Sequence, residues 1–361
     1  MSVAEQVAAW LAGLDRVPAA CVEAAGKLLL DVAGLCVAAR REEYVQATLA
    51  TAEDAGGGCT ALGHAGGWGA YDAALVNGTA AHGEDYDDTF EGGPVHSGAV
   101  VVPAVLALCE RERLSGRDLL RGVVGGAEIM CRASLVAPKA IHKAGFHPTA
   151  VLGALAAAAA CAAALRLRPD QGASAIGIAG STASGIIEYL ADGSWTKRMH
   201  AGWAAQAGMR AALMARAGFV GPLTVLEGTH GFYKAFAPGR APDFSKLLDG
   251  LGQEWVMPSI AFKPYACGTM TQPYIDCAVA LARRGIDPEG VAEIVCDVGE
   301  GTVHRLWEPL EVKHRPPTPY AAKFSTPFCV AVGVLEQRAG FEQFSESRIH
   351  DPAVLALTGK V

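Results

Sequence analysis

Residues 150–165 are the longest apolar segment of the chain, and most of them are alanine. Alanine has the highest helix propensity of all residues, so this segment predicts an α-helix. A helix that spans a membrane needs roughly 20 apolar residues, which is more than the segment has, and Arg166 and Arg168 follow it directly. The segment therefore predicts a buried helix in the core of a globular domain.

Further segments on both sides carry apolar residues at helical spacing, separated by short turn signals. They cover residues 3–14, 19–40, 42–52, 70 onward, 97–110, 116–136, 173–189 and 196–217. We therefore predict a large all-helical domain at residues 1–254. Beyond Pro238, proline, charged and β-branched residues become more frequent. Residues 258–265 and 291–298 have the pattern of strands, and 271–284 and 327–336 that of helices. We predict a smaller α+β domain at residues 255–361.

The composition restricts the function. A chain of 361 residues with 51% hydrophobic residues can bury two cores, and its net charge of −7 argues against a nucleic-acid partner, which needs a broad basic surface. The ten cysteines are scattered along the chain and include no CxxC pair, which indicates reduced cysteines in the core. The first residues lack the basic region of a signal peptide. We expect a cytoplasmic protein with neither a membrane nor a nucleic-acid partner and with a small anionic ligand.

An acidic segment at residues 82–98 is the first candidate site. Two histidines, His82 and His96, enclose five carboxyl groups: Glu84, Asp85, Asp87, Asp88 and Glu91. Carboxyl groups this close cannot all ionise freely, so the pKa of at least one should rise unless cations approach. The candidate cations are distant in the sequence: His147, Lys197–His200 and Lys263. The alternative is a solvated acidic face.

Basic residues at a predicted helix start are the second candidate. Thr196 is expected to cap this helix, which places Lys197, Arg198 and His200 in its first turn. Cations there repel the helix dipole, and a bound anion would relieve that repulsion. Lys197 and His200 are three residues apart and share a face. A basic surface patch is the alternative. His147, just before the alanine-rich helix, should have its pKa lowered by the helix dipole.

Six separate segments carry the motifs of a known family in the family's order. They are NGTAAHGEDYDDT at 77–89, HSG at 96–98, GFHPT at 145–149, GSWTKRMHAG at 193–202, IAFKPYAC at 260–267 and KFSTPF at 323–328. The series resembles the MmgE/PrpD family, whose members include 2-methylcitrate dehydratase, cis-aconitate decarboxylase and iminodisuccinate epimerase. The resemblance implies a large helical and a smaller α+β domain, a site between them without metal or cofactor, and a homodimer.

The resemblance also implies roles for particular residues. Motif matching places the functional aspartate and threonine, the two site histidines and the two lysines of the family on Asp85, Thr89, His96, His147, Lys197 and Lys263. The chain departs from the family pattern in three ways. It stops before the length at which members commonly end, so the smaller domain is expected to be incomplete. Phe328 and Gln272 stand where members often have a tyrosine and a histidine.

The function predicted first is a cofactor-independent dehydratase of a hydroxy di- or tricarboxylate. Removal of a proton beside a carboxylate creates a dianion, which needs fixed cations. His96 or His147 would take the proton, and Asp85 or the other histidine would protonate the leaving hydroxyl group. The residues expected to bind substrate or stabilise its charge are Lys197, Lys263, Thr89, His200 and Arg198.

Four alternatives remain open. The same cations would serve a decarboxylase of a cis-aconitate-like acid or an epimerase of an aminodicarboxylate. A metal site is a third, although HExxH is absent and His82 with Asp85 or Asp87 is a weak ligand pair. The fourth is a non-catalytic paralogue, indicated by the early end of the chain and by Phe328 and Gln272.

Overall fold

The computed structural model describes residues 1–53 and 56–361. Helices predominate, and these residues contain isolated β-bridges but no strand. The chain forms two compact units. The first consists of Met1–Gly83 and Asp87–Phe262, and the second of Glu84–Tyr86 and Lys263–Val361. The domain border proposed between residues 254 and 255 stays a prediction. Within the described part of the chain, every helix is too short or too polar to cross a membrane.

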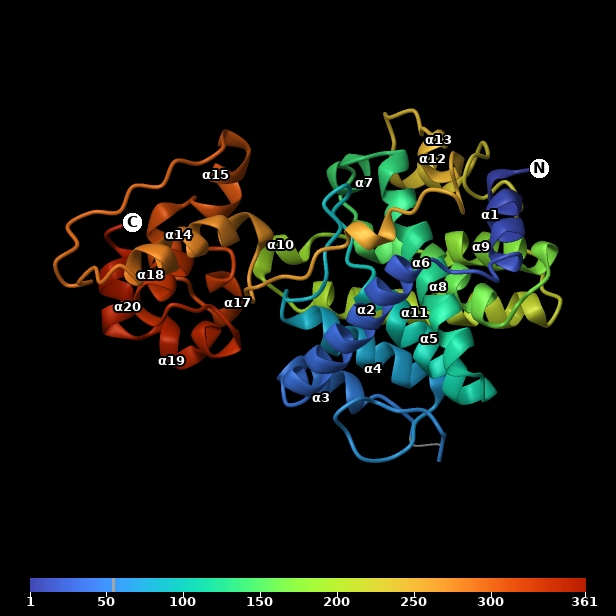
Figure 1. Ribbon diagram of the computed structural model, residues 1–361, viewed down its shortest axis with the longest axis horizontal. Coiled ribbons are helices and arrows are strands. Elements are labelled where there is room, and N and C mark those ends of the chain that lie inside the picture. The colour runs from blue at the N-terminus through green and yellow to red at the C-terminus, as the bar shows by residue number, and fades with distance from the viewer. Residues whose placement is uncertain (54–55) are drawn as a thin grey trace. The chain divides into compact units, whose positions relative to one another are not determined.

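The described residues of the first unit form helices joined by loops and contain no strand, as predicted (Figure 1). Its helices are α1 (Val3–Ala12), α2 (Ala19–Ala39), α3 (Glu43–Leu49), α4 (Ala70–Gly83), α5 (Gly98–Glu112), α6 (Gly116–Val136), α7 (Ala140–Lys143), α8 (Pro148–Ala164), α9 (Pro169–Thr182), α10 (Tyr189–Asp192), α11 (Thr196–Arg216), α12 (Phe232–Phe236), α13 (Ser245–Leu248) and the 3-10 turn η1 (Met257–Ser259). The bounds predicted for the helix at 173–189 are wrong at both ends, because α9 begins at Pro169 and ends at Thr182.

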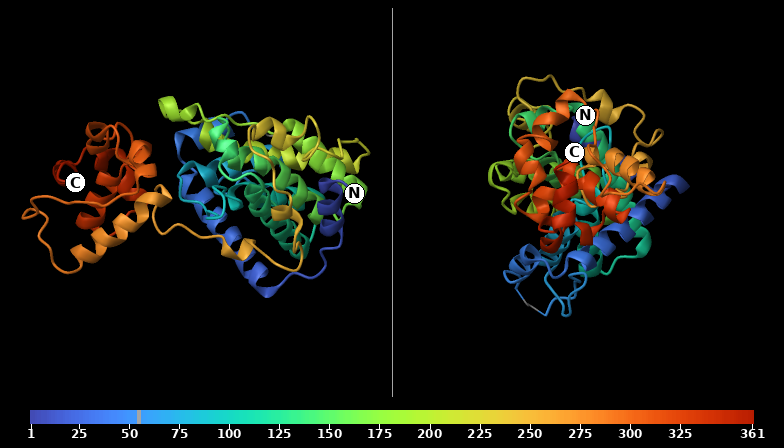
Figure 2. Two further views of the ribbon diagram at one scale, coloured as in Figure 1. Left: turned by 90° about the horizontal axis from the view of Figure 1, so that it is seen from above. Right: turned by 90° about the vertical axis from the view of Figure 1, so that its left-hand side faces the viewer.

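Helix α8 is the centre of this unit, and all of its residues are buried. Helices α5, α6, α9 and α11 pack against it. Figure 2 gives two further views of the ribbon. Small side chains permit this packing: a Cβ atom at Gly126 of α6 would lie 2.5 Å from that of Ala160. Close packing of this kind stabilises a helix through dispersion and burial of apolar area. The prediction of a buried alanine-rich helix is confirmed.

Helix α4 continues through Asn77 and Gly78, a pair that often forms a turn. Tertiary contacts explain why. The buried Asn77 side chain donates to the carbonyl of Thr60 and accepts from the amide of Leu62, at 2.8 and 2.7 Å. A Cβ atom at Gly78 would lie 2.5 Å from the Cα atom of Gly202. The two glycines therefore allow α4 and α11 to cross in close contact.

The predicted start of α8 is confirmed, and the predicted cap of α11 is wrong by one residue. His147 is the N-cap of α8 and Pro148 its first residue, as predicted. Thr196 is not the cap of α11, because Trp195 holds that position and Thr196 is already helical. The error is one residue, within the usual uncertainty of helix ends.

The second unit is also helical in its described residues, so the α+β class predicted for it is wrong. It contains η2 (Thr269–Thr271), α14 (Gln272–Ala282), α15 (Glu300–Leu306), α16 (Leu310–His314), α17 (Pro319–Ala322), α18 (Thr326–Glu336), η3 (Phe341–Phe344), α19 (Glu346–Ile349) and α20 (Pro352–Thr358). The predicted helices 271–284 and 327–336 correspond to α14 and α18. Both pack together in the apolar core, and α20 packs against α18.

The two predicted strands are absent from the described residues for a physical reason. In the segment 291–298, the amide of Ile294 donates to the carbonyl of Lys360, and Val295 is 77% exposed. The segment 258–265 begins in η1, and Ala261 forms an isolated bridge with Thr89. A strand needs a neighbouring strand to pair its backbone groups, and β-branched composition alone does not supply one.

Candidate active site

Four histidines from four separate segments meet inside the first unit, and we call them the histidine cluster: His82, His96, His147 and His200. His82 ends α4, His96 precedes α5, His147 caps α8 and His200 lies in α11. The ring centroids are 5.1 Å apart for His82 and His96, 5.4 Å for His82 and His147, and 5.3 Å for His147 and His200. The fold thus assembles three predicted site histidines with His82, which had no predicted role beyond a weak metal pair.

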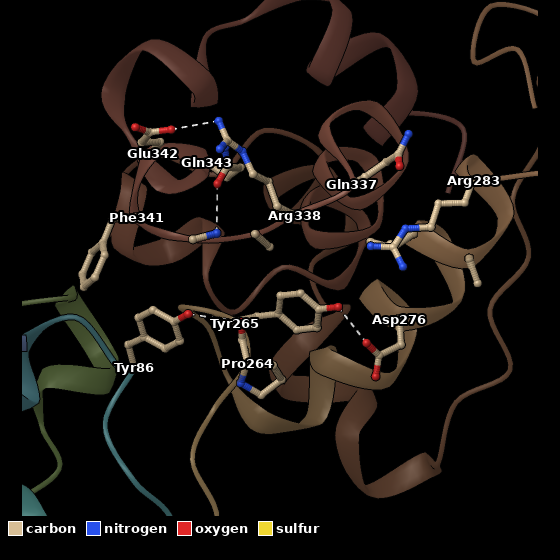
Figure 3. Close-up of a pocket in the computed structure, with 14 residues that line it drawn as sticks. Tyr86, Pro264, Tyr265, Asp276, Arg283, Gln337, Arg338, Phe341, Glu342 and Gln343 are labelled. Carbon is tan, nitrogen blue, oxygen red and sulfur yellow. Dashed lines mark hydrogen bonds and ion pairs between the residues drawn. The ribbon is translucent and has the colours of Figure 1, made fainter. Parts of the chain in front are cut away.

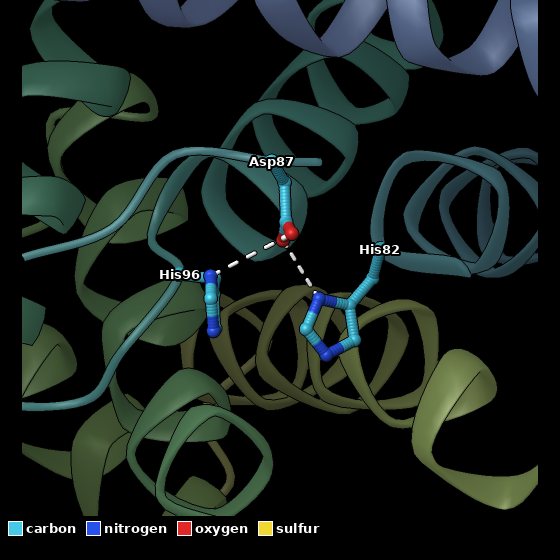
Figure 4. Close-up of side chains that lie close together, drawn as sticks. All are labelled: His82, Asp87 and His96. Carbon is cyan, nitrogen blue, oxygen red and sulfur yellow. Dashed lines mark hydrogen bonds and ion pairs between the residues drawn. The ribbon is translucent and has the colours of Figure 1, made fainter. Parts of the chain in front are cut away.

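Two oxygen groups fix the ring orientation at one end of this cluster: the carboxylate of Asp87, drawn in Figure 4, and the backbone carbonyl of Asp88. Nδ1 of His82 lies 2.7 Å from Oδ2 of Asp87, with both side chains fully buried. Nδ1 of His96 lies 2.6 Å from the carbonyl oxygen of Asp88 and 3.6 Å from Oδ1 of Asp87. Oxygens of these kinds accept hydrogen, so Nδ1 of each ring carries the proton. When the rings are neutral, Nε2 therefore holds the lone pair.

At the other end of the cluster, His147 and His200 are held in the neutral form. Burial lowers the pKa of His147 well below its ordinary value, and charge on four neighbours adds to this: His82, Lys197, His200 and His96. The pKa of His200 falls to about 4, first through burial and then through charge on His82 and Lys197. The direction predicted for His147 is confirmed, but burial and not the helix dipole is the main cause.

Asp88 confirms that one carboxyl group of the acidic segment has a raised pKa. The pKa of Asp88 is raised to about 8. Burial is the main cause, and the charges of Asp87 and Asp31 add to it. The carboxyl group accepts hydrogen bonds from the amides of Ser97 and Gly98, at 3.0 and 2.8 Å. Asp88 therefore holds the start of α5, and a Cβ atom at Gly98 would lie 2.5 Å from its Oδ1. The role of Asp88 is to anchor the segment that carries His96.

The three basic residues Lys197, Arg198 and His200 of α11 have different surroundings. Lys197 and His200 are both buried, and the charge of Lys197 lowers the pKa of His147 and of His200. Arg198 lies with its guanidinium carbon 4.3 Å from the ring centroid of Tyr44. The structure thus groups Lys197 and His200 with the histidine cluster, while Arg198 makes a cation–π contact with Tyr44.

Thr89 is positioned through its backbone. Its amide donates to the carbonyl of Ala261, and the amide of Ala261 donates to the carbonyl of Thr89, each at 2.8 Å. Its side chain is partly exposed. The predicted role in binding a substrate carboxylate stays a prediction.

The remaining predicted site residues, Asp85 and Lys263, meet in the second unit. Nζ of Lys263 donates to the carbonyl oxygen of Asp85 at 2.8 Å and lies 3.5 Å from its Oδ1. Both residues are buried. Asp85 has a φ of 56°, in the left-handed region that non-glycine residues rarely adopt, and such strain is common at functional sites.

A second lysine binds the acidic segment, although the sequence did not indicate it as a site residue. Nζ of Lys323, 1% exposed, donates to the backbone carbonyl and to Oε2 of Glu84, at 2.7 and 2.6 Å. Phe341 and Phe344 lie beside the ammonium group, each with its ring centroid 5.7 Å away. The signal was present in the KFSTPF motif, which begins with this lysine.

The two departures from the family pattern both have structural roles in the second unit. The side-chain amide nitrogen of Gln272, Nε2, donates to the backbone carbonyls of Tyr265 and Cys267, each at 3.3 Å. Phe328 is fully buried in the apolar core, 6.0 Å from Phe344 between ring centroids. These contacts give both residues a function in holding the fold.

Each unit has a cavity of its own. In the first unit, a cavity of about 750 Å³ reaches His200 and has a mainly apolar lining that includes Ile186, Tyr189 and Trp203. In the second unit, a cavity of about 650 Å³ is bounded by Tyr86, whose hydroxyl donates to the carbonyl of Pro264 at 3.1 Å (Figure 3). The cavity at His200 is the better candidate for a substrate because it contacts the histidine cluster.

Three side chains approach one another as metal ligands would. One ligand atom from each of His82, Asp87 and His96 lies within 4.8 Å of the others. However, Nδ1 of each ring already makes a short hydrogen bond to an oxygen, and the carboxylate of Asp87 accepts that of His82. The arrangement is that of a carboxylate that orients imidazoles.

The chain is similar in sequence to known proteins. Residues 5–245 match the MmgE/PrpD N-terminal domain, and residues 265–361 match the MmgE/PrpD C-terminal domain. The chain is 30% identical to a cis-aconitate decarboxylase of Aspergillus terreus, in an alignment that covers 99% of this chain and 77% of that protein. It is 28% identical to the cis-aconitate decarboxylase-like protein oryM of Aspergillus oryzae, in an alignment that covers 99% of this chain and 79% of that protein. It is 31% identical to the cis-aconitate decarboxylase of Mus musculus, in an alignment that covers 80% of this chain and 59% of that protein.

These relatives favour the decarboxylase alternative over the dehydratase predicted first. With both domain models matched in order along nearly its whole length, the chain belongs to the MmgE/PrpD family.

Proposed function

We propose that this protein is a cofactor-independent lyase that decarboxylates a small unsaturated tricarboxylate of the cis-aconitate type. The observation that carries the proposal is the histidine cluster, in which His82, His147 and His200 are buried and the charge of Lys197 acts on the pKa of His147. The named relatives support the choice of reaction, since they are cis-aconitate decarboxylases.

The chemistry explains why such a site suits the reaction. When the bond from carbon to a carboxylate breaks, carbon dioxide leaves and the electron pair stays on a carbon skeleton that bears further carboxylates. A fixed cation stabilises that developing charge most effectively in a site of low dielectric. A proton must then reach carbon, and an imidazole that has first taken up a proton from solvent can deliver it and return to its neutral form. We assign the cation to Lys197 and the proton transfer to His96 or His147.

The other predicted residues have supporting roles in this proposal. Lys263 and Thr89 would bind carboxylate groups of the substrate, and Asp85, which pairs with Lys263, would set the position of its ammonium group. His200 would hold His147 through the contact between their Nδ1 atoms. The cavity of about 750 Å³ at His200 has the volume of a small-molecule site, for which roughly 300–1,000 Å³ is usual.

A dehydratase is the second candidate, and one observation favours it. The lowered pKa of His147 keeps the ring neutral at pH 7, which suits a base that takes a proton from carbon. A hydroxy acid would then lose water, with the same cation stabilising the dianion.

A product assay distinguishes the two reactions. The purified full chain is incubated with cis-aconitate, 2-methylcitrate and citrate in deuterated water, and products are followed by NMR. Release of carbon dioxide with one deuterium added to carbon supports the decarboxylase, and loss of water without carbon dioxide supports the dehydratase. Lys197→Met should abolish either activity, while Lys27→Met, which removes an exposed pair with Glu23, should leave it unchanged. Absence of turnover with all three acids would contradict the proposal.

A further inference from the structure

His82 lies next to both histidines to which proton transfer was assigned. Its ring is 5.1 Å from that of His96 and 5.4 Å from that of His147, and it stacks on the latter at an angle of 23° between planes. His82 therefore contacts both rings. Since a misplacement of about 1 Å can reduce a rate about 100-fold, a residue that sets this spacing has a direct effect on catalysis.

Asp87 fixes His82 in one tautomer. Its Oδ2 accepts from Nδ1 of His82 at 2.7 Å, and both side chains are completely buried. A charge-assisted hydrogen bond of this length is strong when water is excluded. In Figure 4, Nε2 of His82 and Nε2 of His96 both point away from Asp87. The carboxylate thus determines which ring atom of His82 faces the remainder of the cluster.

Nε2 of His82 is a second, independent observation. It is buried and has no hydrogen-bond partner among the described residues. A buried polar atom without a partner costs roughly 1–3 kcal/mol, so a side chain that merely filled space would be better replaced by an apolar ring. The cost is understandable if a water molecule that enters with the substrate donates a hydrogen bond to Nε2.

We propose that Asp87 and His82 form a carboxylate–imidazole pair that positions His96 and His147 for proton transfer. The inference rests on the proposed lyase function and adds two positioning residues to it. The charged and titratable groups around His82 are Asp87 from the segment after α4, His96 from the segment before α5, His147 at the start of α8, and Lys197 and His200 from α11.

The first test measures the tautomer directly. Histidine labelled with nitrogen-15 gives separate signals for Nδ1 and Nε2, and wild-type His82 should carry its hydrogen on Nδ1. In Asp87→Asn, which keeps the shape of the side chain, the amide can donate to Nδ1, and the hydrogen of His82 should move to Nε2. A wild-type His82 with its hydrogen on Nε2 would overturn the inference, whether or not the protein is an active lyase.

The second test measures positioning. In His82→Asn the nitrogen signals of His96 and His147 should shift, and kcat should fall about 100-fold with KM changed by less than about threefold. His64→Asn is the matched control, because His64 also has a buried Nε2 without a hydrogen-bond partner but lies outside the cluster. Unchanged signals of His96 and His147 in folded His82→Asn would overturn the inference. A wild-type protein inactive on all acids but with the expected signals would instead refute the proposed function alone.

Discussion

The Nδ1 atoms of His147 and His200 lie 3.2 Å apart on two buried rings. A hydrogen bond contains one hydrogen, so in the neutral pair one Nδ1 donates and the other accepts, and the two rings are different tautomers. Protonation of both rings would place two positive charges together in a region of low dielectric, beside Lys197. The pair is therefore stable only above the pH at which the rings take up protons.

We expect the free energy of unfolding to decrease as the pH falls from 6.5 towards 4. In this interval the unfolded chain binds a proton at His200 that the folded chain does not, because the folded pKa is lowered from 6.5 to about 4. The loss from this group should be on the order of 2 kcal/mol. Urea unfolding at pH 7 and pH 5 should show a smaller difference for His200→Asn. The exposed control, His350→Asn, should match wild type, and an unchanged difference in His200→Asn would contradict this assignment.

Asp88 should have the opposite pH dependence. Its folded pKa of about 8 lies above the ordinary value of 3.8, so between these values the folded chain keeps a proton that the unfolded chain has released. This contribution is complete below pH 3.8 and is lost as the pH rises through 8. Between pH 5 and pH 8, wild type should lose roughly 2–4 kcal/mol relative to Asp88→Asn, which resembles the protonated acid. Chemical denaturation at both pH values measures this, with exposed Asp170→Asn as the control.

Removal of the buried lysine of the second unit should be costly. Lys323→Met leaves the carboxylate of Glu84 without its ammonium partner, and breaking a buried ion pair in this way typically costs about 3–5 kcal/mol. Arg338→Met is the matched control, since its pair with Glu342 is exposed and should contribute less than about 1 kcal/mol. Hydrogen exchange of α18 would follow the second unit specifically. Equal effects of the two substitutions would refute a structural role for Lys323.

The crossing of α4 and α11 gives a prediction about glycine. A Cβ atom at Gly202 would clash with the carbonyl oxygen of Leu75, so Gly202→Ala should destabilise the protein by about 1–3 kcal/mol. Gly34 lies within α2 and has open space around its Cα atom, so Gly34→Ala should stabilise it by up to about 1 kcal/mol. Thermal unfolding of both variants should show shifts of opposite sign. Shifts of the same sign would mean that the helix crossing relaxes.

The sequence was sufficient to identify most helices of the first unit and the start of α8. Helical spacing, alanine content and the proline after His147 act through contacts within a few residues, so they can be recognised without the fold. The sequence also indicated that a carboxyl group in the acidic segment would have a raised pKa, because repulsion between neighbouring carboxylates follows from their spacing alone. It could not identify Asp88 as that group, since burial is the main cause.

Only the tertiary structure decided the partners. It paired His82 with Asp87, Asp85 with Lys263 and Glu84 with Lys323, three choices that a run of similar acids leaves open. It also left residues 291–298 without a strand partner, although their composition is that of a strand. In each case the outcome depends on which distant segment comes within a few ångströms, and a hydrogen bond or ion pair loses its strength beyond that distance.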